Sequence, residues 1–156
     1  MNETQTHTTS QEKLNLHPVI IRLLEKRGLD ENGIREFLSW DLKQMPDLTE
    51  MQDMTKASER IVSAIINGER VGIYGDYDVD GATSTALLGR YFDELRLAYE
   101  IYIPDRKTEG YGPSIKGFKE LIEKNVKVIF TVDCGTLSFQ AIDYAKSKNI
   151  DVIVLD

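Results

Sequence analysis

The hydrophobic pattern of the chain changes in character near residue 68. Before that point apolar residues recur every three or four positions, which predicts helices around residues 19–24, 34–38 and 61–66. The polar, aperiodic residues 1–11 are expected to form a disordered tail. The first part of the chain is therefore predicted to be a small helical region, residues 12–68, that follows this tail.

From residue 69 onward, short runs rich in Val and Ile alternate with segments of helical period. The predicted strands cover residues 71–74, 99–103, 126–132 and 150–156. The predicted helices cover residues 82–95, 115–122 and 137–149. In the first of these helices Leu87, Tyr91 and Leu95 are spaced by four, which indicates a helix. Strands of Val and Ile that alternate with helices are typical of an α/β fold, with a parallel sheet covered by helices on both faces.

Aspartates follow each of the predicted strands, in the order Asp76, Asp78 and Asp80, then Asp105, Asp133 and Asp156. The carboxyl ends of parallel strands lie along one edge of an open sheet, where ligands bind, so we expect these carboxylates to converge there. Like charges brought that close raise one another's pKa unless cations neutralise them. Because hard oxygen ligands suit Mg²⁺ or Mn²⁺, the sequence predicts a divalent metal site with more than one ion.

Other interpretations of these acids were compared with their spacing. An Asp after a strand is also a common helix N-cap, and this alternative stays open for Asp80 and Asp105. Residues 76–87 begin like an EF-hand loop, but Leu87 stands where that loop needs Glu, which excludes it. Asp76 and Asp78 also fit the D-x-D-x-[TV] start of haloacid dehalogenase-like phosphatases, although Asp80 at the fifth position weakens this interpretation. Neither glycine-rich nucleotide-binding pattern is present.

Composition limits the partners and the compartment. The chain has 156 residues, a net charge of −7 and a pI near 4.9, so we expect any contact with phosphate to be local or mediated by metal. Its single cysteine, Cys134, excludes an internal disulfide and is expected to be a small buried residue. No apolar run approaches the ~20 residues of a membrane span, and no signal peptide is recognisable. We therefore expect a cytoplasmic protein without membrane contact.

Four stretches resemble, in order and spacing, the successive motifs of the DHH phosphoesterases: GDYDVDGATSTALL (75–88), IPDRKTEGYG (103–112), TVDCGTLS (131–138) and VIVLD (152–156). Within that family they are most similar to bacterial exonucleases specific for single-stranded DNA. The segments LLEKRGLDENGIREFL and MQDMTKASERIVSAIINGERV also resemble the region before the catalytic core. The resemblance implies that residues 69–156 are the first half of a DHH domain and stop at the D of the D-H-H motif.

The resemblance also implies roles for five aspartates. Asp78 and Asp80 match the paired metal ligands of the first motif, with Asp76 as a supporting or additional ligand. Asp133 matches the carboxylate that bridges two metal ions, and Asp156 matches the D of D-H-H. The resemblance thus implies two Mn²⁺ or Mg²⁺ ions as cofactors, with Asp78, Asp80 and Asp133 as the catalytic residues that hold them.

A further motif suggests how substrate binds. Arg106, Glu109, Tyr111 and Gly112 match the R-x-x-E-G-Y-G segment of the family, which implies that they bind substrate. Arg106 is expected to meet a phosphate, and the glycines to let backbone approach. Tyr111 is expected either to stack on a base or to pack within the protein.

The implied activity is hydrolysis of single-stranded DNA from its 5′ end, in DNA recombination and repair. The two histidines of D-H-H and the second catalytic lobe are not among these residues, and only His7 and His17 are present. We therefore expect an enzyme for the complete protein and little or no activity for this chain alone. A binding module or remnant without catalysis, and a DHH phosphodiesterase acting on short RNA, remain alternatives. The sequence does not identify which protein partners, if any, the chain binds.

Overall fold

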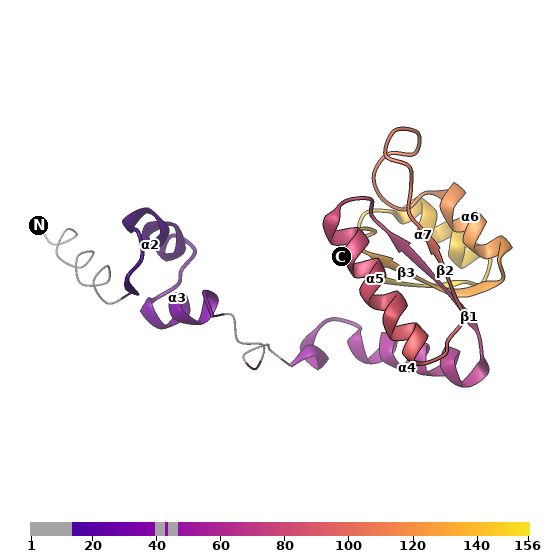
Figure 1. Ribbon diagram of the computed structural model, residues 1–156, viewed down its shortest axis with the longest axis horizontal. Coiled ribbons are helices and arrows are strands. Elements are labelled where there is room, and N and C mark those ends of the chain that lie inside the picture. The colour runs from indigo at the N-terminus through magenta and orange to yellow at the C-terminus, as the bar shows by residue number, and fades with distance from the viewer. Residues whose placement is uncertain (1–13, 40–42, 44–46) are drawn as a thin grey trace, which may run out of the picture. The chain divides into compact units, whose positions relative to one another are not determined.

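The computed structural model describes residues 14–39, 43 and 47–156 (Figure 1). The chain forms two compact units, residues 1–51 and 52–156. The disordered tail expected at residues 1–11 lies outside the described residues. None of the described helices is long and apolar enough to cross a membrane.

In its described residues the first unit contains the helices α2 (Pro18–Glu25) and α3 (Glu31–Phe37) and the 3₁₀ turn η2 (Leu48–Glu50). The side chains of His17 and Asp30 cap α2 and α3 by accepting backbone N–H groups. Ile21, Leu24 and Ile34 are buried. The helices expected around residues 19–24 and 34–38 are therefore confirmed.

The second unit is a four-stranded parallel sheet with helices on both faces, as the sequence predicts (Figure 1). Its elements in chain order are α4 (Met54–Asn67), β1 (Arg70–Gly75), α5 (Val79–Glu94), β2 (Tyr99–Tyr102), α6 (Ile115–Glu123), β3 (Val126–Val132), α7 (Phe139–Ser147) and β4 (Asp151–Leu155). By this division α4 lies in the same unit as the sheet, whereas the sequence grouped it with the preceding helices. The boundary expected after residue 68 stays a prediction.

The strand order is β2-β1-β3-β4, so the chain leaves β1 toward one edge of the sheet and returns to its other side as β3. Gly75 of β1 pairs with Val132 of β3, and Val132 pairs with Leu155 of β4, so these three strands end level with one another. Adjacent strands whose connections run in opposite directions form a switch point, where open α/β sheets bind ligands. In this fold the switch point lies between the carboxyl ends of β1 and β3.

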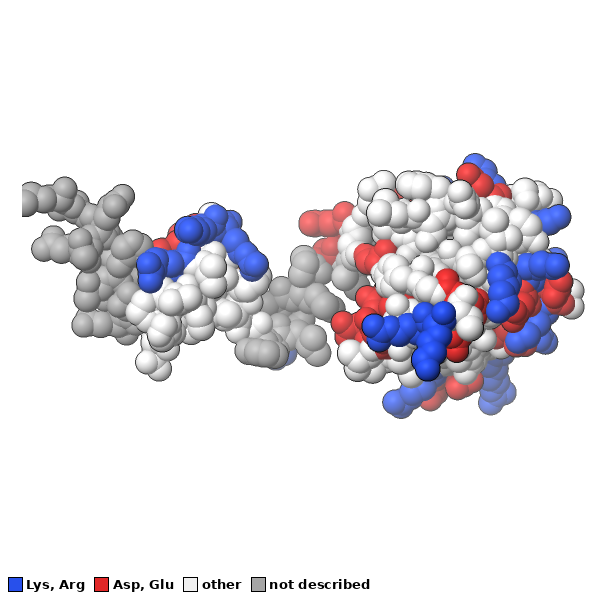
Figure 2. Space-filling view, turned by 90° about the horizontal axis from the view of Figure 1, so that it is seen from above, with Lys and Arg blue, Asp and Glu red and all other residues white. Residues whose placement is uncertain are grey.

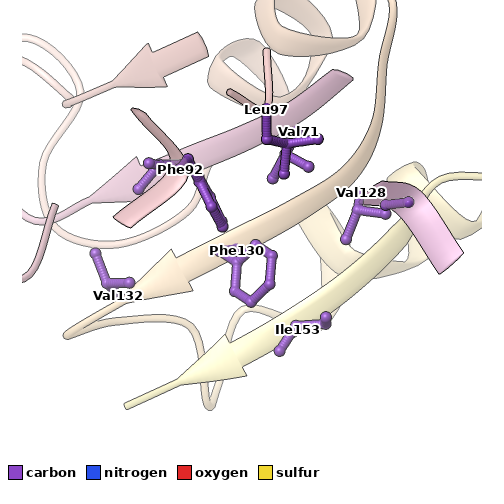
Figure 3. Close-up of a cluster of buried hydrophobic side chains, with 9 residues drawn as sticks. Val71, Phe92, Leu97, Val128, Phe130, Val132 and Ile153 are labelled. Carbon is purple, nitrogen blue, oxygen red and sulfur yellow. The ribbon is translucent and has the colours of Figure 1, made fainter. Parts of the chain in front are cut away.

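A buried apolar cluster lies on each face of the sheet. On the face covered by α4 and α5, side chains from three strands pack against Phe92 and Leu97, and Figure 3 labels Val71, Phe92, Leu97, Val128, Phe130, Val132 and Ile153. On the other face, α6 and α7 contribute Phe118, Leu121, Ala141 and Ala145. Helix α4 also bonds to the sheet's last strand, since Arg60 pairs with Asp151. The two clusters hold the strand ends in place.

The buried side of α5 is not the side that carries the apolar residues spaced by four. Leu87 and Tyr91 are 73% and 58% exposed, and Leu95 is exposed as well. The buried side of the helix carries small residues and one aromatic: Gly81, Thr85, Gly89 and Phe92. Small residues let α5 lie close to β1 and β2, so the larger side chains on the opposite side remain exposed.

Candidate metal centre

Three carboxylates gather at the switch point. Asp76 directly follows β1, Asp78 lies two residues later, and Asp133 directly follows β3. Each offers an oxygen atom, and the three atoms lie within 4.8 Å of one another. Among the described residues, these acids from two neighbouring strands have the spacing of a metal-binding group.

Asp76 is the buried member of the group, with 1% of its surface exposed. Its Oδ1 atom has no hydrogen-bond partner. A buried carboxylate oxygen without a partner costs free energy, which a bound cation removes. The unpartnered oxygen therefore fits a divalent cation held between the three acids.

Asp78 is fixed by the start of α5. Its Oδ1 accepts hydrogen bonds from the backbone N–H groups of Asp80 and Gly81, each at 3.1 Å, which makes it the N-cap of the helix. The capping role that stayed open for Asp80 thus belongs to Asp78. The positive end of the helix dipole favours a negative charge at this position.

Asp133 adopts an uncommon backbone conformation at the end of β3. Its φ of 59° lies in the left-handed region, and its N–H donates to the carbonyl of Leu155 at 2.8 Å. Burial raises the pKa of its carboxyl group, and the negative charge of Asp78 raises it further. Ionisation of Asp133 is therefore less favourable in the metal-free site than for a free aspartate.

Gly81 brings α5 and β1 into close contact, and the sequence pattern alone did not mark it as part of the site. A Cβ atom at this position would lie 2.5 Å from the carbonyl oxygen and 2.6 Å from the backbone nitrogen of Asp76. Glycine therefore lets the capped turn with Asp78 approach Asp76. The sequence feature that could have revealed this role is the position of Gly81 directly after Asp76, Asp78 and Asp80.

The other aspartates of the sheet edge lie outside the group of three. Asp80 is exposed in the first turn of α5. Asp156 accepts the N–H of Thr136 at 2.9 Å, and this bond lowers the pKa of its carboxyl group. Asp105 accepts the N–H groups of Lys107 and Thr108, and its bonds to Thr108 lower its pKa. Asp105 thus caps a turn rather than a helix, and it follows the edge strand β2, which is separated from β3 by β1.

The loop after β2 carries the residues of the second motif. The guanidinium of Arg106 lies over the ring of Tyr77, 5.4 Å from its centroid. The exposed ring of Tyr111 reaches the third strand's end, where its hydroxyl donates to the carbonyl of Asp133 at 3.3 Å. Gly112 is buried, and its carbonyl accepts the hydroxyl of Tyr74 at 3.0 Å. Arg106 and Tyr111 therefore lie beside residues of the acidic turns.

Glu109 lies in the same loop, but its carboxylate is used within the protein. Its oxygens accept the hydroxyl of Tyr102 at 2.5 Å and the N–H of Asp105 at 3.1 Å. Lys116 lies 3.5 Å away, and only 10% of the Glu109 side chain is exposed. The hydrogen bond from Tyr102 is the main cause that lowers the pKa of Glu109.

Cys134 follows Asp133 but is not a candidate nucleophile. It is fully buried, and burial raises the pKa of its thiol to about 12. A thiol with so high a pKa carries little thiolate at neutral pH. The expectation of a small buried residue is confirmed.

Charges on the visible face of the larger unit are mixed. Figure 2 shows Lys and Arg side chains beside Asp and Glu side chains, around an extended area of uncharged ones. This face therefore carries no continuous basic surface. The arrangement agrees with local rather than broad contacts to phosphate.

Comparison with family models gives one assignment that covers more than half of the chain. Residues 70–156 match the model described as "DHH family, N-terminal domain". The first helical unit and α4 lie before this match. The matched residues include the three acids of the metal centre and the whole sheet.

Curated relatives extend the similarity to nearly the whole chain. The chain is 39% identical over 146 residues to the single-stranded-DNA-specific exonuclease RecJ of Bacillus subtilis (strain 168), which covers 93% of this chain and 19% of the relative. It is 30% identical to RecJ of Escherichia coli (strain K12), over 100% of this chain and 27% of the relative. The chain thus spans between about a fifth and a quarter of the length of these relatives.

Solved structures show the same fold. A crystal structure of exonuclease RecJ bound to manganese matches with a TM-score of 0.63 and 32% identity, over 68% of this chain and 27% of that one. RecJ from Thermus thermophilus in complex with Mn²⁺ matches with a TM-score of 0.58 and 27% identity, over 69% of this chain and 15% of that one. The family match, the RecJ relatives and the shared fold agree with the order of the four motifs, and the chain belongs to the DHH family.

Proposed function

We propose that this chain carries the metal-binding half of the active site of an exonuclease that degrades single-stranded DNA from its 5′ end, in recombination and repair. The observation that carries the proposal is the approach of Asp76, Asp78 and Asp133 to within 4.8 Å at the switch point of the sheet. The names of the RecJ relatives, which are single-stranded-DNA-specific exonucleases, support the choice of substrate. The manganese in the similar structures supports the choice of metal.

The three acids fit a divalent cation because a buried oxygen of Asp76 has no other partner. Asp76, Asp78 and Asp133 would hold the metal, and we propose Asp80 and Asp156 as further ligands of a complete site. Two Mn²⁺ or Mg²⁺ ions bound there would lower the pKa of an attacking water and stabilise the departing oxygen. Asp78 contributes by holding its carboxylate against the start of α5, and Asp133 by its fixed backbone.

The loop after β2 is proposed to hold the DNA strand. Arg106 lies over the ring of Tyr77, the residue between Asp76 and Asp78 in the sequence. At this position its guanidinium can pair with a phosphate oxygen. Tyr111 has an exposed ring beside Asp133, which suits stacking on a base. Gly112 leaves its position free of a side chain, so the backbone can approach the strand.

We propose that residues 1–156 alone hydrolyse little or no DNA. The two histidines that follow the D of D-H-H in the family are not among them. Metal affinity is therefore expected to be measurable but weak, and catalysis to need the complete site.

Metal binding by the purified 156-residue chain tests the site directly. Titration with Mn²⁺, followed by the electron paramagnetic resonance of the free ion, should show binding that Asp78→Asn and Asp133→Asn each weaken by about tenfold or more. Asp143→Asn changes an aspartate of α7, outside the site, and should leave binding unchanged. Equal binding by all four proteins would contradict the proposed metal centre.

The substrate is tested on the product of the complete gene. In Mn²⁺ it should release mononucleotides from the 5′ end of a single-stranded DNA oligonucleotide and leave duplex DNA intact. An RNA oligonucleotide of the same sequence serves as the competitor. Faster cleavage of short RNA, or release from the 3′ end, would replace the proposed substrate by another.

A further inference from the structure

Glu109 is a nearly buried carboxylate that the metal centre does not use. Its partners come from three parts of the unit: Tyr102 ends β2, Asp105 begins the loop, and Lys116 lies in the first turn of α6. One side chain thus links the loop to the edge strand on one side and to the following helix on the other. The short contact to Tyr102, at 2.5 Å, is the typical length of a hydrogen bond between a hydroxyl and a charged carboxylate.

A second attachment secures the other end of the loop. The ring of Tyr102 stacks on Tyr74 with centroids 5.1 Å apart, and the Tyr74 hydroxyl donates to the carbonyl of Gly112. Gly117 makes room for this pair, because a Cβ atom there would lie 2.6 Å from both rings. The loop is therefore attached at Glu109 and at Gly112, through two tyrosines that contact each other.

Of the residues proposed to hold DNA, one lies before these attachments and one lies between them. Arg106 precedes Glu109 by three positions and lies over Tyr77. Tyr111 lies between Glu109 and Gly112 and reaches the carbonyl of Asp133. The conformation of the attached segment therefore decides whether both side chains face the acidic turns.

We propose that Glu109 is a positioning residue, which holds this loop so that Arg106 and Tyr111 face the metal centre, and that it does not itself contact substrate. This differs from the substrate-binding role that the family motif suggested for it. The part of this proposal that names DNA as the ligand of the loop rests on the proposed function. The attachment itself does not depend on DNA.

Limited trypsin digestion of the 156-residue chain measures the attachment without DNA or metal, since Arg106 and Lys107 are cleavage sites inside the loop. In Glu109→Ala, cleavage after these residues should rise about tenfold, as expected when a hydrogen-bonded charged group is lost. Glu109→Gln keeps an oxygen that accepts from Tyr102 and should rise less. Glu94→Ala removes an exposed carboxylate at the end of α5 and should match the unchanged protein.

The pattern of cleavage separates positioning from general stability. A positioning role raises cleavage in the loop, at Arg106 and Lys107, whereas general destabilisation raises it equally at Lys119 of α6 and Lys146 of α7, neither of which contacts Glu109. Unchanged loop cleavage in Glu109→Ala, or an equal rise at every site, would overturn the proposal.

Ligand binding adds a second measurement. In the complete gene product, Glu109→Ala should keep Mn²⁺ affinity within about twofold and weaken binding of a 5′-phosphorylated oligonucleotide by about tenfold. Loss of Mn²⁺ binding, or loss of DNA binding in Glu109→Gln with unchanged loop cleavage, would make Glu109 a direct ligand and overturn the positioning role. If the unchanged protein bound no DNA, the proposed function would fail while the digestion result still decided the role of Glu109.

Discussion

The metal centre and the loop after β2 use the same acidic residue types in opposite electrostatic arrangements. In the loop, Asp105 and Glu109 are met by N–H and hydroxyl donors, which lower the pKa of both carboxyl groups. In the metal centre, Asp133 faces Asp78 and has a raised pKa, and an oxygen of Asp76 has no partner. The two loop acids are stabilised by their partners in the folded chain, whereas Asp133 and the unpartnered oxygen of Asp76 carry a cost that a bound cation would remove.

This difference separates structural acids from functional ones. Asp105 and Glu109 are stabilised by donors within the protein, whereas Asp76 and Asp133 lie beside other carboxylates and gain most from a bound cation. The position of an acid after a strand does not separate the two classes, because Asp105 follows a strand just as Asp133 does. The neighbouring groups separate them, because N–H donors surround Asp105, whereas Asp133 lies beside Asp78. The predictions below test this difference by changing one region or the other.

The largest effect is expected from Gly81→Ala in the metal centre. The added methyl group would lie within 2.6 Å of the Asp76 backbone, so α5 must move away from β1. We expect a loss of about 3 kcal/mol in the free energy of unfolding and loss of Mn²⁺ binding, measured by urea denaturation and titration.

The loop offers the matched substitution, Gly110→Ala. Gly110 has a φ of +80°, and no other atom lies within 4 Å of where the added methyl group would be, so only left-handed strain of about 1 kcal/mol is added. Mn²⁺ binding should persist. Equal losses in the two variants would mean that the contact between Gly81 and Asp76 does not hold the site together.

Mn²⁺ should reverse the effect of Asp133→Asn. Without metal this change removes a repelled charge and should raise the melting temperature, since Asn also tolerates the left-handed backbone. With Mn²⁺ at 100 times its dissociation constant the unchanged protein gains about 2.7 kcal/mol, which the variant should lack. Differential scanning fluorimetry in EDTA and in Mn²⁺ measures both. The same sign of effect in both conditions would contradict the difference drawn between the regions.

Removal of the Tyr102 hydroxyl, which binds Glu109 of the loop, should destabilise the protein more than removal of the Tyr111 hydroxyl, which reaches Asp133 of the metal centre. Tyr102→Phe leaves Glu109 without its short hydrogen bond and should cost about 1 to 2 kcal/mol of unfolding free energy. Tyr111→Phe removes a 3.3 Å contact from an exposed ring and should cost about 0.5 kcal/mol or less. Urea denaturation compares the two. A larger loss of unfolding free energy for Tyr111→Phe would argue that the loop is held mainly by its contact with Asp133 rather than by Glu109.

The smallest effect is a difference in pH dependence, measured in EDTA. Because the pKa of Glu109 is lowered on folding, its contribution to stability is present above the ordinary glutamate pKa of about 4.3 and is lost as the pH falls through its folded value. Because the pKa of Asp133 is raised, its contribution is present below the ordinary aspartate pKa of about 3.9 and is lost as the pH rises through its folded value.

Melting temperatures of Glu109→Gln and Asp133→Asn between about pH 3 and pH 6 test this difference. Relative to the unchanged protein, Glu109→Gln should become more destabilising as the pH rises. Asp133→Asn should become more stabilising over the same range. Slopes of the same sign would contradict the opposite environments of the two carboxylates.

Much of the fold could be predicted from the pattern of residues. The third strand was predicted at residues 126–132, where the structure has β3, because a strand buried on both faces is a continuous apolar run. The core face of α5 could not be predicted. A helix that lies close to a sheet buries small residues, and the spacing of Leu87 and Tyr91 does not reveal which side faces the sheet.

The sequence by itself determined the alternation of strands and helices, the acids at the strand ends and the four motifs of the DHH family. Only the tertiary structure decided which acids meet. The order β2-β1-β3-β4 places Asp133 beside Asp76 and leaves Asp105 after the edge strand. Periodicity along a chain reports the type of element, because side chains repeat every 3.6 residues in a helix and every two in a strand. It does not report which strands become neighbours, because that depends on contacts between residues far apart in the sequence.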